Sequence, residues 1–401
     1  MIYFRKYSKQ FLLELFFSVV LFELFLGGGG RLVMIGPLTL RMLLFSVLIV
    51  ISGILLINKV KIDIVYFRLL MLYFILILFA GVLGYFHHAT PVAIFTDIKP
   101  LLYFLSILFF AIIIKSYNQI EIIFRIIKIS AVILALTYLI LMFLIVCKIL
   151  TFDQIYYLSD SKFYSEFIFN GTLGCFYYKG FIFLSIGFFF YFIEDSVFSK
   201  ITSLLILISI FFTLSRGLVI DLLIMDLCYV FFKRKKGIKW KYHLVLIALL
   251  LLYLTFYGWF RFYGNGFQLM GDKTSSNLER VNQIKEVYEN TNFTSFFIGH
   301  GFGIGVPSKD VHMEITYLEI LNKQGLIGLS FWLYLLINIL LNFKKLINNS
   351  EVCNKTIPLL FAVLIIYLHS LTNPYLMNPI GISIVLIGYI SFNVLSKNEK
   401  I

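Results

Sequence analysis

The stretch WFRFYGNGFQLMGDKTSSNLERVNQIKEVYENTNFTSFFIGHGFGIGVPSKDVHMEITYLEILNKQG (Trp259–Gly325) is a long polar interruption in an otherwise apolar sequence. It collects arginines, glycines, acids and histidines, whereas the sequence on either side of it is compatible with lipid. Charged groups are costly inside a bilayer and cheap at its edge, so a membrane protein that keeps such a segment usually carries out its chemistry there.

The composition predicts one polytopic membrane protein with an all-α fold. The chain has 401 residues, of which 60% are hydrophobic and 14% are charged, whereas a soluble domain carries roughly a quarter charged residues. The net charge of +13 would suit a nucleic-acid-binding protein. We exclude that class, because the lysines and arginines are dispersed in short clusters beside apolar runs, as in membrane loops.

The apolar runs predict about twelve membrane-spanning helices, since roughly 20 apolar residues cross the hydrocarbon core. The expected spans are 11–26, 37–57, 64–86, 98–114, 122–147, 177–193, 200–214, 217–232, 241–258, 325–342, 356–371 and 379–395. The predicted organisation is a transmembrane bundle over 1–258 with about nine spans and a periplasmic loop over 259–324 with short helices and a glycine-rich turn. A second bundle over 325–401 has about three spans.

Loop charges predict the orientation. The run KRKKGIKWK (Lys233–Lys241) is the strongest cytoplasmic signal, and Arg5, Lys6 and Lys9 place the N-terminus on the same side. With twelve spans the C-terminus is also cytoplasmic. The long polar loop then faces the periplasm or the outside of the cell.

Arg216, in the sequence TLSRG (Thr213–Gly217), lies at a turn between two apolar runs on the predicted outer face. It can anchor the chain at the outer leaflet. Alternatively, its planar donors match a membrane-bound anion such as a lipid diphosphate.

Arg280 lies in the segment SSNLERVNQIKEVYEN, where Ser276 and Glu279 have the spacing of a capping box and predict a helix that begins near Asn277. Apolar residues recur at helical intervals and are expected to lie against the membrane or the bundle: Leu278, Val281, Ile284 and Val287. Arg280 would then be a helix residue beside that stripe. On a solvated face it would pair with Glu279 or Glu286.

The last part of the loop alternates glycines at Gly299, Gly301, Gly303 and Gly305, which predicts a loop whose backbone N–H groups can face an anion. His312 and Glu314 follow, just before or within the first turn of a helix expected from about Met313, which enters the membrane near Gly325. No metal-ligand cluster or nucleotide-binding loop stands out, so we expect chemistry without a metal or cofactor.

The order of these features resembles the O-antigen polymerase (Wzy) and O-antigen ligase family of bacterial membrane proteins. The resemblance covers roughly residues 180–390 and rests on TLSRG, the Arg280 helix, IGHGFGIG (Ile298–Gly305), TYLEILNKQGLIG (Thr316–Gly328) and LTNPYL (Leu371–Leu376). It implies a GT-C-like membrane fold and arginines, Arg216 and Arg280, that bind a lipid diphosphate. The ligase pattern has a histidine eleven residues before its Gly-x-x-Gly end. Counted from Gly325, Glu314 stands at that position, which favours a polymerase.

The resulting hypothesis is an inverting, metal-independent transfer of a growing glycan from undecaprenyl diphosphate to a new lipid-linked repeat unit. Glu314 is the expected general base, with His312 as the substitute candidate. Further residues are expected to contact substrate: Arg261, Gly301, Gly303, Tyr317, Asn373 and Tyr375. The expected partners are the lipid-linked donor and acceptor, membrane lipids, a chain-length regulator and a flippase.

Three alternatives remain open from the sequence. A ligase would transfer finished polymer to lipid A-core with the same arginines. A flippase or secondary transporter of lipid-linked oligosaccharide would place polar residues near the bilayer midplane. A non-catalytic scaffold in an assembly complex would need none of these side chains for chemistry.

Overall fold

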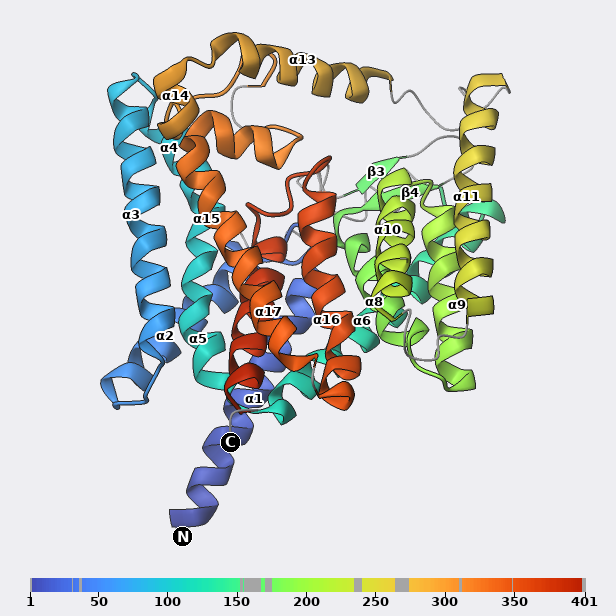
Figure 1. Cartoon of the computed structure of the whole chain (residues 1–401), viewed down its shortest axis with the longest axis horizontal. Coiled ribbons are helices and arrows are strands. Elements are labelled where there is room, and N and C mark those ends of the chain that lie inside the picture. The colour runs from blue at the N-terminus through green and yellow to red at the C-terminus, as the bar shows by residue number, and fades with distance from the viewer. Residues whose placement is uncertain are drawn as a thin grey trace. The chain divides into compact units, whose positions relative to one another are not determined.

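The computed structural model describes residues 2–30, 32–35, 38–151, 154, 167–169, 175–233, 240–263, 274–309, 312–347 and 349–398. Within these residues the chain is helical almost throughout (Figure 1), which confirms the predicted all-α fold. The helices are α1 (Ile2–Leu26), α2 (Leu40–Ile57), α3 (Ile64–Phe86), α4 (Pro91–Leu101), η1 (Leu102–Leu105), α5 (Ser106–Ile113), α6 (Tyr117–Val146), η3 (Lys179–Phe181), α8 (Ile182–Phe192), α9 (Val197–Phe212), α10 (Arg216–Lys233), α11 (Trp240–Tyr263), α13 (Thr274–Asn290), α14 (Phe293–Ile298), α15 (Thr316–Leu346), α16 (Ser350–His369) and α17 (Pro379–Asn398). Two short antiparallel pairs complete it: β1 (Met34–Ile35) with β2 (Leu38–Thr39), and β3 (Phe167–Phe169) with β4 (Phe176–Tyr178).

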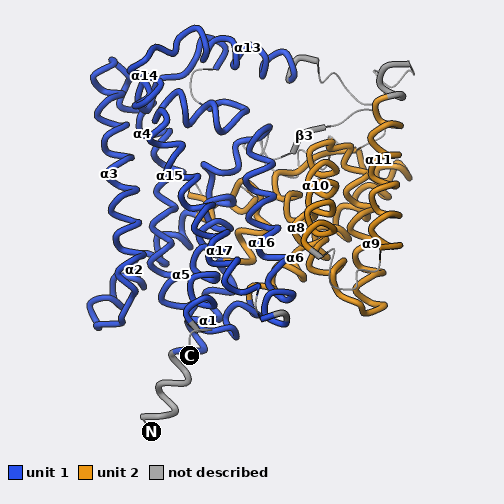
Figure 2. The backbone as a smooth tube through the Cα atoms, in the orientation of Figure 1, with its two compact units in different colours: residues 1–20, 42–122, 274–401 blue, residues 21–41, 123–273 orange. Residues whose placement is uncertain are grey.

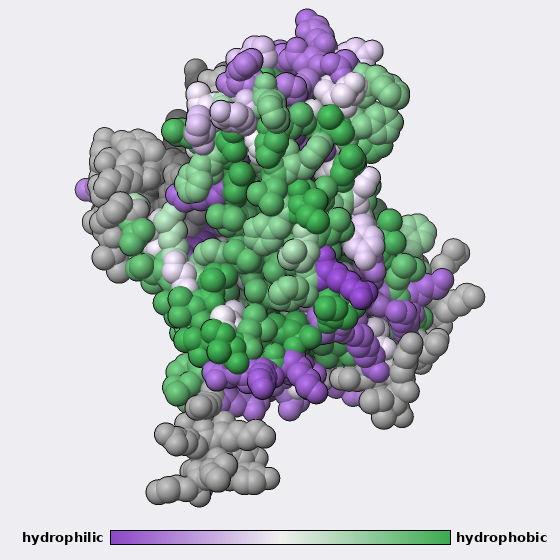
Figure 3. Space-filling model, turned by 90° about the vertical axis from the view of Figure 1, so that its left-hand side faces the viewer, coloured by the Kyte–Doolittle hydropathy of each residue, from purple (hydrophilic) through white to green (hydrophobic). Residues whose placement is uncertain are grey.

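Eight helical segments of the described chain are long and apolar enough to cross a membrane. They are 40–57, 64–86, 91–113, 117–146, 240–258, 316–346, 351–369 and 379–397, and η3–α8 and α9 form two shorter apolar helices. The two remaining predicted spans, 11–26 and 217–232, fall on α1 and α10. The face that α3 dominates shows a broad apolar band with polar residues gathered above and below it (Figure 3). This pattern is that of a polytopic membrane protein.

The chain divides into two compact units (Figure 2). Unit 1 comprises 1–20, 42–122 and 274–401, and unit 2 comprises 21–41 and 123–273. The predicted loop over 259–324 is itself divided. Its first residues continue α11 to Tyr263 in unit 2, whereas α13, α14 and the glycine-rich segment belong to unit 1.

An aromatic cluster holds α15 against α3 and η1 in unit 1. The rings of Tyr73 and Phe104 stack with centroids 3.9 Å apart, and Tyr73 lies 5.2 Å from Phe331 and 6.1 Å from Trp332. Trp332 is only 1% exposed. Because such large rings bury much area and prefer defined mutual geometries, this cluster fixes the membrane part of α15.

Gly325 breaks α15 where the sequence predicted that the chain enters the membrane. Its φ of 63° and ψ of −164° are non-helical, and they divide α15 into a short outer helix and a long apolar one. A Cβ at this position would lie 2.3 Å from the carbonyl oxygen of Phe297. Only glycine fits both the conformation and the contact.

The glycine-rich segment packs directly on the outer end of α3. A Cβ on Gly84 would lie 2.0 Å from the Phe302 carbonyl oxygen, and a Cβ on Gly301, whose φ is +92°, would lie 2.0 Å from the Gly84 nitrogen. The Phe302 N–H donates to the Ala80 carbonyl at 2.9 Å. These backbone contacts position the loop that follows.

Gly84→Ala is expected to displace the glycine-rich segment and to lower the melting temperature in detergent, because backbone atoms cannot yield as a flexible side chain can. Overpacking of this kind costs about 1–3 kcal/mol or more. Gly53→Ala is the control, since nothing lies within 4 Å of a Cβ there in α2, and alanine is the better helix former. A Gly84→Ala protein as stable as the Gly53→Ala protein would contradict this packing.

Candidate functional site

Helix α13 turns several polar residues toward the rest of unit 1 and leaves most of its apolar residues exposed. Gln283 is fully buried, whereas Leu278, Val281 and Ile284 are 61%, 60% and 49% exposed. Of the predicted apolar stripe, Val287 alone is buried, in a cluster with Val306, Met313 and Leu318. The inward side of the helix is therefore a source of polar groups.

Arg280 pairs with Glu314, and not with the acids of its own helix. The Arg280 Nη2 lies 3.1 Å from the Glu314 Oε2, with the two side chains 24% and 28% exposed. The neighbouring acids have other partners: Glu279 binds the Lys309 ammonium at 2.6 Å, and Glu286 accepts from Ser308. The structure thus joins two residues that the sequence predicted as site residues 34 positions apart.

His312 contacts a buried carboxylate. Its Nδ1 lies 3.2 Å from Glu319 Oε1 and 3.8 Å from Asp97 Oδ1, while its own side chain is 48% exposed. Glu319 and Asp97 are almost fully buried, at 3% and 1%. A ring whose Nδ1 donates to a carboxylate leaves its Nε2 as an acceptor, an arrangement that orients a general base.

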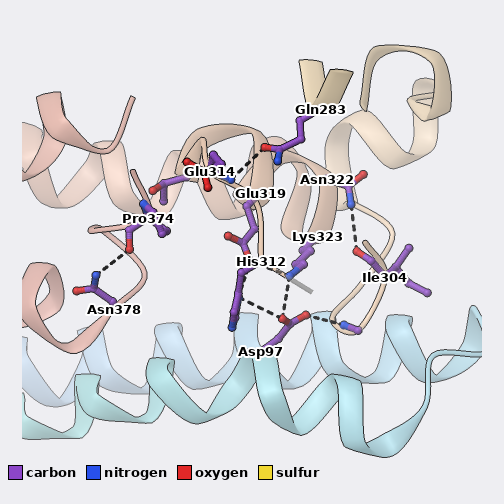
Figure 4. Close-up of polar contacts among 12 residues, drawn as sticks. Asp97, Gln283, Ile304, His312, Glu314, Glu319, Asn322, Lys323, Pro374 and Asn378 are labelled. Atoms are coloured by element: carbon purple, nitrogen blue, oxygen red, sulfur yellow. Dashed lines mark hydrogen bonds and ion pairs between the residues drawn. The ribbon is translucent and has the colours of Figure 1, made fainter. Parts of the chain in front are cut away.

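Lys323 lies at the centre of this cluster with no exposed surface. Its Nζ is 2.8 Å from Asp97 Oδ1 and 2.7 Å from Glu319 Oε1. The Gly303 N–H donates to the other Asp97 oxygen at 2.7 Å. Figure 4 shows these side chains of α15 and the loop directed at Asp97 on α4. A buried charge is stable only when it is paired in this way.

The same carboxylates raise the question of a metal. Asp97, His312 and Glu319 offer ligand atoms within 4.8 Å of one another. The Lys323 ammonium, however, touches the same two oxygens, Oδ1 and Oε1. A cation would have to displace this ammonium, so the donor set does not fit a metal and we assign none there.

Several backbone N–H groups of the glycine-rich loop have acceptors within the chain. Those of His300 and Gly301 donate to the carbonyl groups of Asn322 and Lys323 at 2.7 and 3.0 Å, and that of Gly303 donates to Asp97. The Gly303 N–H thus faces an internal carboxylate. Close packing accounts for the glycines at positions 301 and 303.

Arg216 lies in unit 2 at the first position of α10. Its guanidinium lies over the Tyr257 ring, 5.7 Å from the centroid, and none of the ion pairs found among the described residues involves it. The preceding Leu214 has a φ of 52°, a strained value for leucine. A partly exposed guanidinium at a helix N-terminus is suited to an anion.

The other predicted substrate residues have structural contacts. The Tyr317 hydroxyl donates to the Tyr367 carbonyl at 2.7 Å, and the Asn373 amide donates to Thr372 at 3.1 Å. Tyr375 is 4% exposed, with its ring 5.1 Å from that of His369. Asn373 and Tyr375 lie in the turn between α16 and α17, in which the Asn378 amide also donates to the Pro374 carbonyl. The side chain of Arg261, near the end of α11, is outside the described residues.

Sequence analysis missed the residues that support the site: Asp97, Gln283, Glu319 and Lys323. A signal existed for two of them, because Glu319 and Lys323 are four residues apart on a largely apolar helix, the spacing of a helical ion pair. Asp97 is 226 residues from Lys323. No local pattern reports such a contact.

Lys323→Met is expected to destabilise the protein by about 3–5 kcal/mol, because it leaves two buried carboxylates unpaired. Thermal or denaturant unfolding in mixed micelles measures the loss. Lys355→Met is the matched control, since Lys355 also pairs with a glutamate four residues earlier but is 50% exposed. Its removal should change stability little, because exposed pairs contribute little. Equal losses in the two variants would contradict a buried network.

His300 adds a pH-sensitive group beside the site. Its Nε2 is buried without a partner, and its carbonyl lies 2.6 Å from His87 Nδ1. Burial first, and then the nearby His87, hold the pKa of His300 below its usual value of 6.5. The neutral imidazole is thus the form that suits the folded state.

Acidification should therefore destabilise the fold through His300. A lowered folded-state pKa gives a stabilisation that is complete above about pH 6.5 and is lost as the pH falls through the folded pKa, because the unfolded chain binds the proton more readily. The drop in melting temperature between pH 8 and pH 5 should be smaller in His300→Asn than in wild type. His88 is exposed, so the His88→Asn variant should show the same drop in melting temperature as wild type.

Comparison with known proteins gives two matches. Residues 201–333 match the family model described as O-antigen ligase, a range that contains Arg216, Arg280, His312 and Glu314. The chain is also 28% identical to an O-antigen polymerase of Shigella flexneri over 382 residues, which is 93% of this chain and 92% of that protein. Both matches confirm the resemblance that the ordered motifs predicted.

Proposed function

We propose that this relative of the O-antigen polymerases and ligases is a surface-polysaccharide polymerase of a bacterial inner membrane. It transfers a growing glycan from undecaprenyl diphosphate to the non-reducing end of a new lipid-linked repeat unit. The observation that carries the proposal is the convergence of Arg280, Glu314 and His312 in one polar site of unit 1, beside the end of a membrane helix.

The contacts favour His312 over Glu314 as the general base, the reverse of the preference from the sequence. The Glu314 Oε2 is already bound to the Arg280 Nη2 at 3.1 Å. His312 is 48% exposed, and the buried Glu319 holds its Nδ1. Its Nε2 is then free to accept a proton from the acceptor. Glu314 holds the Arg280 guanidinium until substrate arrives.

The reaction balances as a direct displacement. The acceptor hydroxyl gives its proton to His312 Nε2 while its oxygen attacks the anomeric carbon of the donor. The bond from that carbon to the diphosphate oxygen breaks, and its electron pair leaves with undecaprenyl diphosphate. Attack opposite the leaving group inverts the anomeric centre. Arg280 stabilises the charge that develops on the diphosphate, so that the protein supplies positioning and electrostatic stabilisation without a metal or cofactor.

Two of the remaining candidates contact the glycan in this proposal. Asn373 and Tyr317 offer polar groups to sugar hydroxyls, and Tyr375 shapes the turn that carries Asn373. Gly301 and Gly303 act indirectly, since they keep the loop close enough to α3 and α4 for Asp97 to reach Lys323.

The name of the relative supports polymerisation over ligation. The O-antigen polymerase of Shigella flexneri aligns over 93% of this chain, whereas the family model described as O-antigen ligase covers residues 201–333. The active site faces the periplasm in the topology that places both termini in the cytoplasm. A chain-length regulator and a flippase are the expected partners.

A deletion strain complemented with variants tests the function. In a strain with lipopolysaccharide, loss of the polymerase should leave molecules with one repeat unit, and wild type should restore the ladder. His312→Ala should reduce polymer formation about 10²–10⁴-fold, the contribution of a general base. Arg280→Ala should also abolish the ladder. Lys285→Ala, on the exposed side of α13, is the control and should restore it fully.

Complete loss of repeat units on deletion would show a ligase. Purified protein that lengthens lipid-linked glycan without a transmembrane gradient would exclude a transporter. A full ladder from His312→Ala and Arg280→Ala at normal expression would leave a scaffold role.

A further inference from the structure

Two buried donors beside Glu314 have no acceptor. The Gln283 Nε2 and the Arg280 Nε are both inaccessible and both lack a hydrogen-bond partner. The two residues are three positions apart on the inward side of α13, and both contact Glu314. Arg280 binds its carboxylate. Gln283 accepts from its backbone N–H (Figure 4). Buried donors of this kind are nearly always satisfied in proteins, so the pair calls for an explanation.

The orientation of the Gln283 amide follows from its partner. The Glu314 backbone N–H lies 3.0 Å from the Gln283 Oε1. Because a backbone N–H can only donate, the atom that receives it must be the amide oxygen. The Nε2 with its two hydrogens is then necessarily the free end. The unused donors therefore follow from the hydrogen bond to Glu314. They do not depend on an arbitrary choice between the two orientations of the amide.

The chemistry of these donors selects an oxyanion. Arg280 and Gln283 present N–H groups and no free acceptor, and one of the two residues is cationic. A phosphate group supplies several anionic oxygens and suits a guanidinium together with an amide. The Glu314 carboxylate now holds the Arg280 Nη2, and because both side chains are about one-quarter exposed, it can be displaced by a competing anion.

We propose that Gln283 and Arg280 form a phosphate site for the lipid diphosphate, and that the Glu314 carboxylate occupies the place of the phosphate until substrate arrives. On binding, a phosphate oxygen replaces the Glu314 carboxylate at Arg280 and accepts from the Gln283 amide. Gln283 keeps its bond to the Glu314 backbone, so the loop that carries His312 stays in place while the carboxylate swings away. This inference rests on the proposed function and adds Gln283 as a substrate-binding residue.

Direct binding to the full-length protein in detergent micelles tests the site, with farnesyl diphosphate, farnesyl monophosphate and inorganic diphosphate as probes. Gln283→Glu keeps an acceptor for the Glu314 N–H but replaces the amide donors with a negative charge. We expect it to weaken farnesyl diphosphate binding at least tenfold. Asn282→Asp is the matched control, since it makes the same amide-to-acid change at the exposed neighbouring position and should alter the dissociation constant less than twofold.

Glu314→Gln should bind farnesyl diphosphate several-fold more tightly, because the neutral amide competes less for Arg280. Melting temperatures of all variants establish that they are folded, and Gln283→Met provides a neutral replacement that removes the donors should Gln283→Glu fail to fold. A weakening that extends to inorganic diphosphate supports recognition of the phosphates alone. A weakening confined to the farnesyl compounds supports recognition of the lipid-linked head group.

Three outcomes distinguish a failure of this inference from a failure of the proposed function. If wild type binds and Gln283→Glu binds as tightly as Asn282→Asp, Gln283 is not part of the site. Weaker binding by Glu314→Gln than by wild type would overturn the displacement. If wild type binds none of the three probes, the diphosphate donor of the proposed function fails as well.

Discussion

The buried ammonium of Lys323 is the interaction on which the site depends. It joins Asp97 of α4 to Glu319 of α15, and both carboxylates are almost wholly removed from water. Each carboxylate also binds a second group, since Asp97 accepts the Gly303 N–H and Glu319 holds His312. Any one of these charges would be costly in a membrane helix without the others. Together they tie the outer ends of two helices and the loop between α14 and α15 into one unit.

Close backbone packing makes this network geometrically possible. Gly84 and Gly301 let the loop approach α3 so closely that a Cβ on either would collide with backbone. Gly325 turns the outer part of α15 away from the axis of its apolar part. The glycines therefore bring the loop close to α3, and the buried charges hold it there at a defined position.

The inverted character of α13 gives this site its donors. An amphipathic helix usually buries its apolar stripe, yet here Gln283 is buried and Leu278 and Val281 are exposed. The inward groups are a guanidinium with a partly exposed counter-ion and an amide with unused hydrogens. Such a face is better explained by a ligand than by stability, because unpaired buried donors weaken a fold. The exposed apolar residues lie at the polar end of a membrane protein, where lipid or another chain can cover them.

The sequence by itself determined the helical framework and its class. Runs of apolar residues must form helices in a bilayer because every backbone group needs an internal partner, and this constraint is local enough to be read from the chain. It also singled out Arg280, His312 and Glu314 as candidate site residues, because charges beside membrane spans are few. Only the folded structure shows which residues these three side chains pair with. Arg280 could have paired with Glu279 or Glu286 by spacing alone, but Lys309 and Ser308 hold those acids. The partners of His312 and Lys323 include Asp97, on a helix more than two hundred residues away in sequence. Periodicity carries no information about such contacts, since they depend on which surfaces the folded helices bring together and on the need of each buried charge for an opposite one.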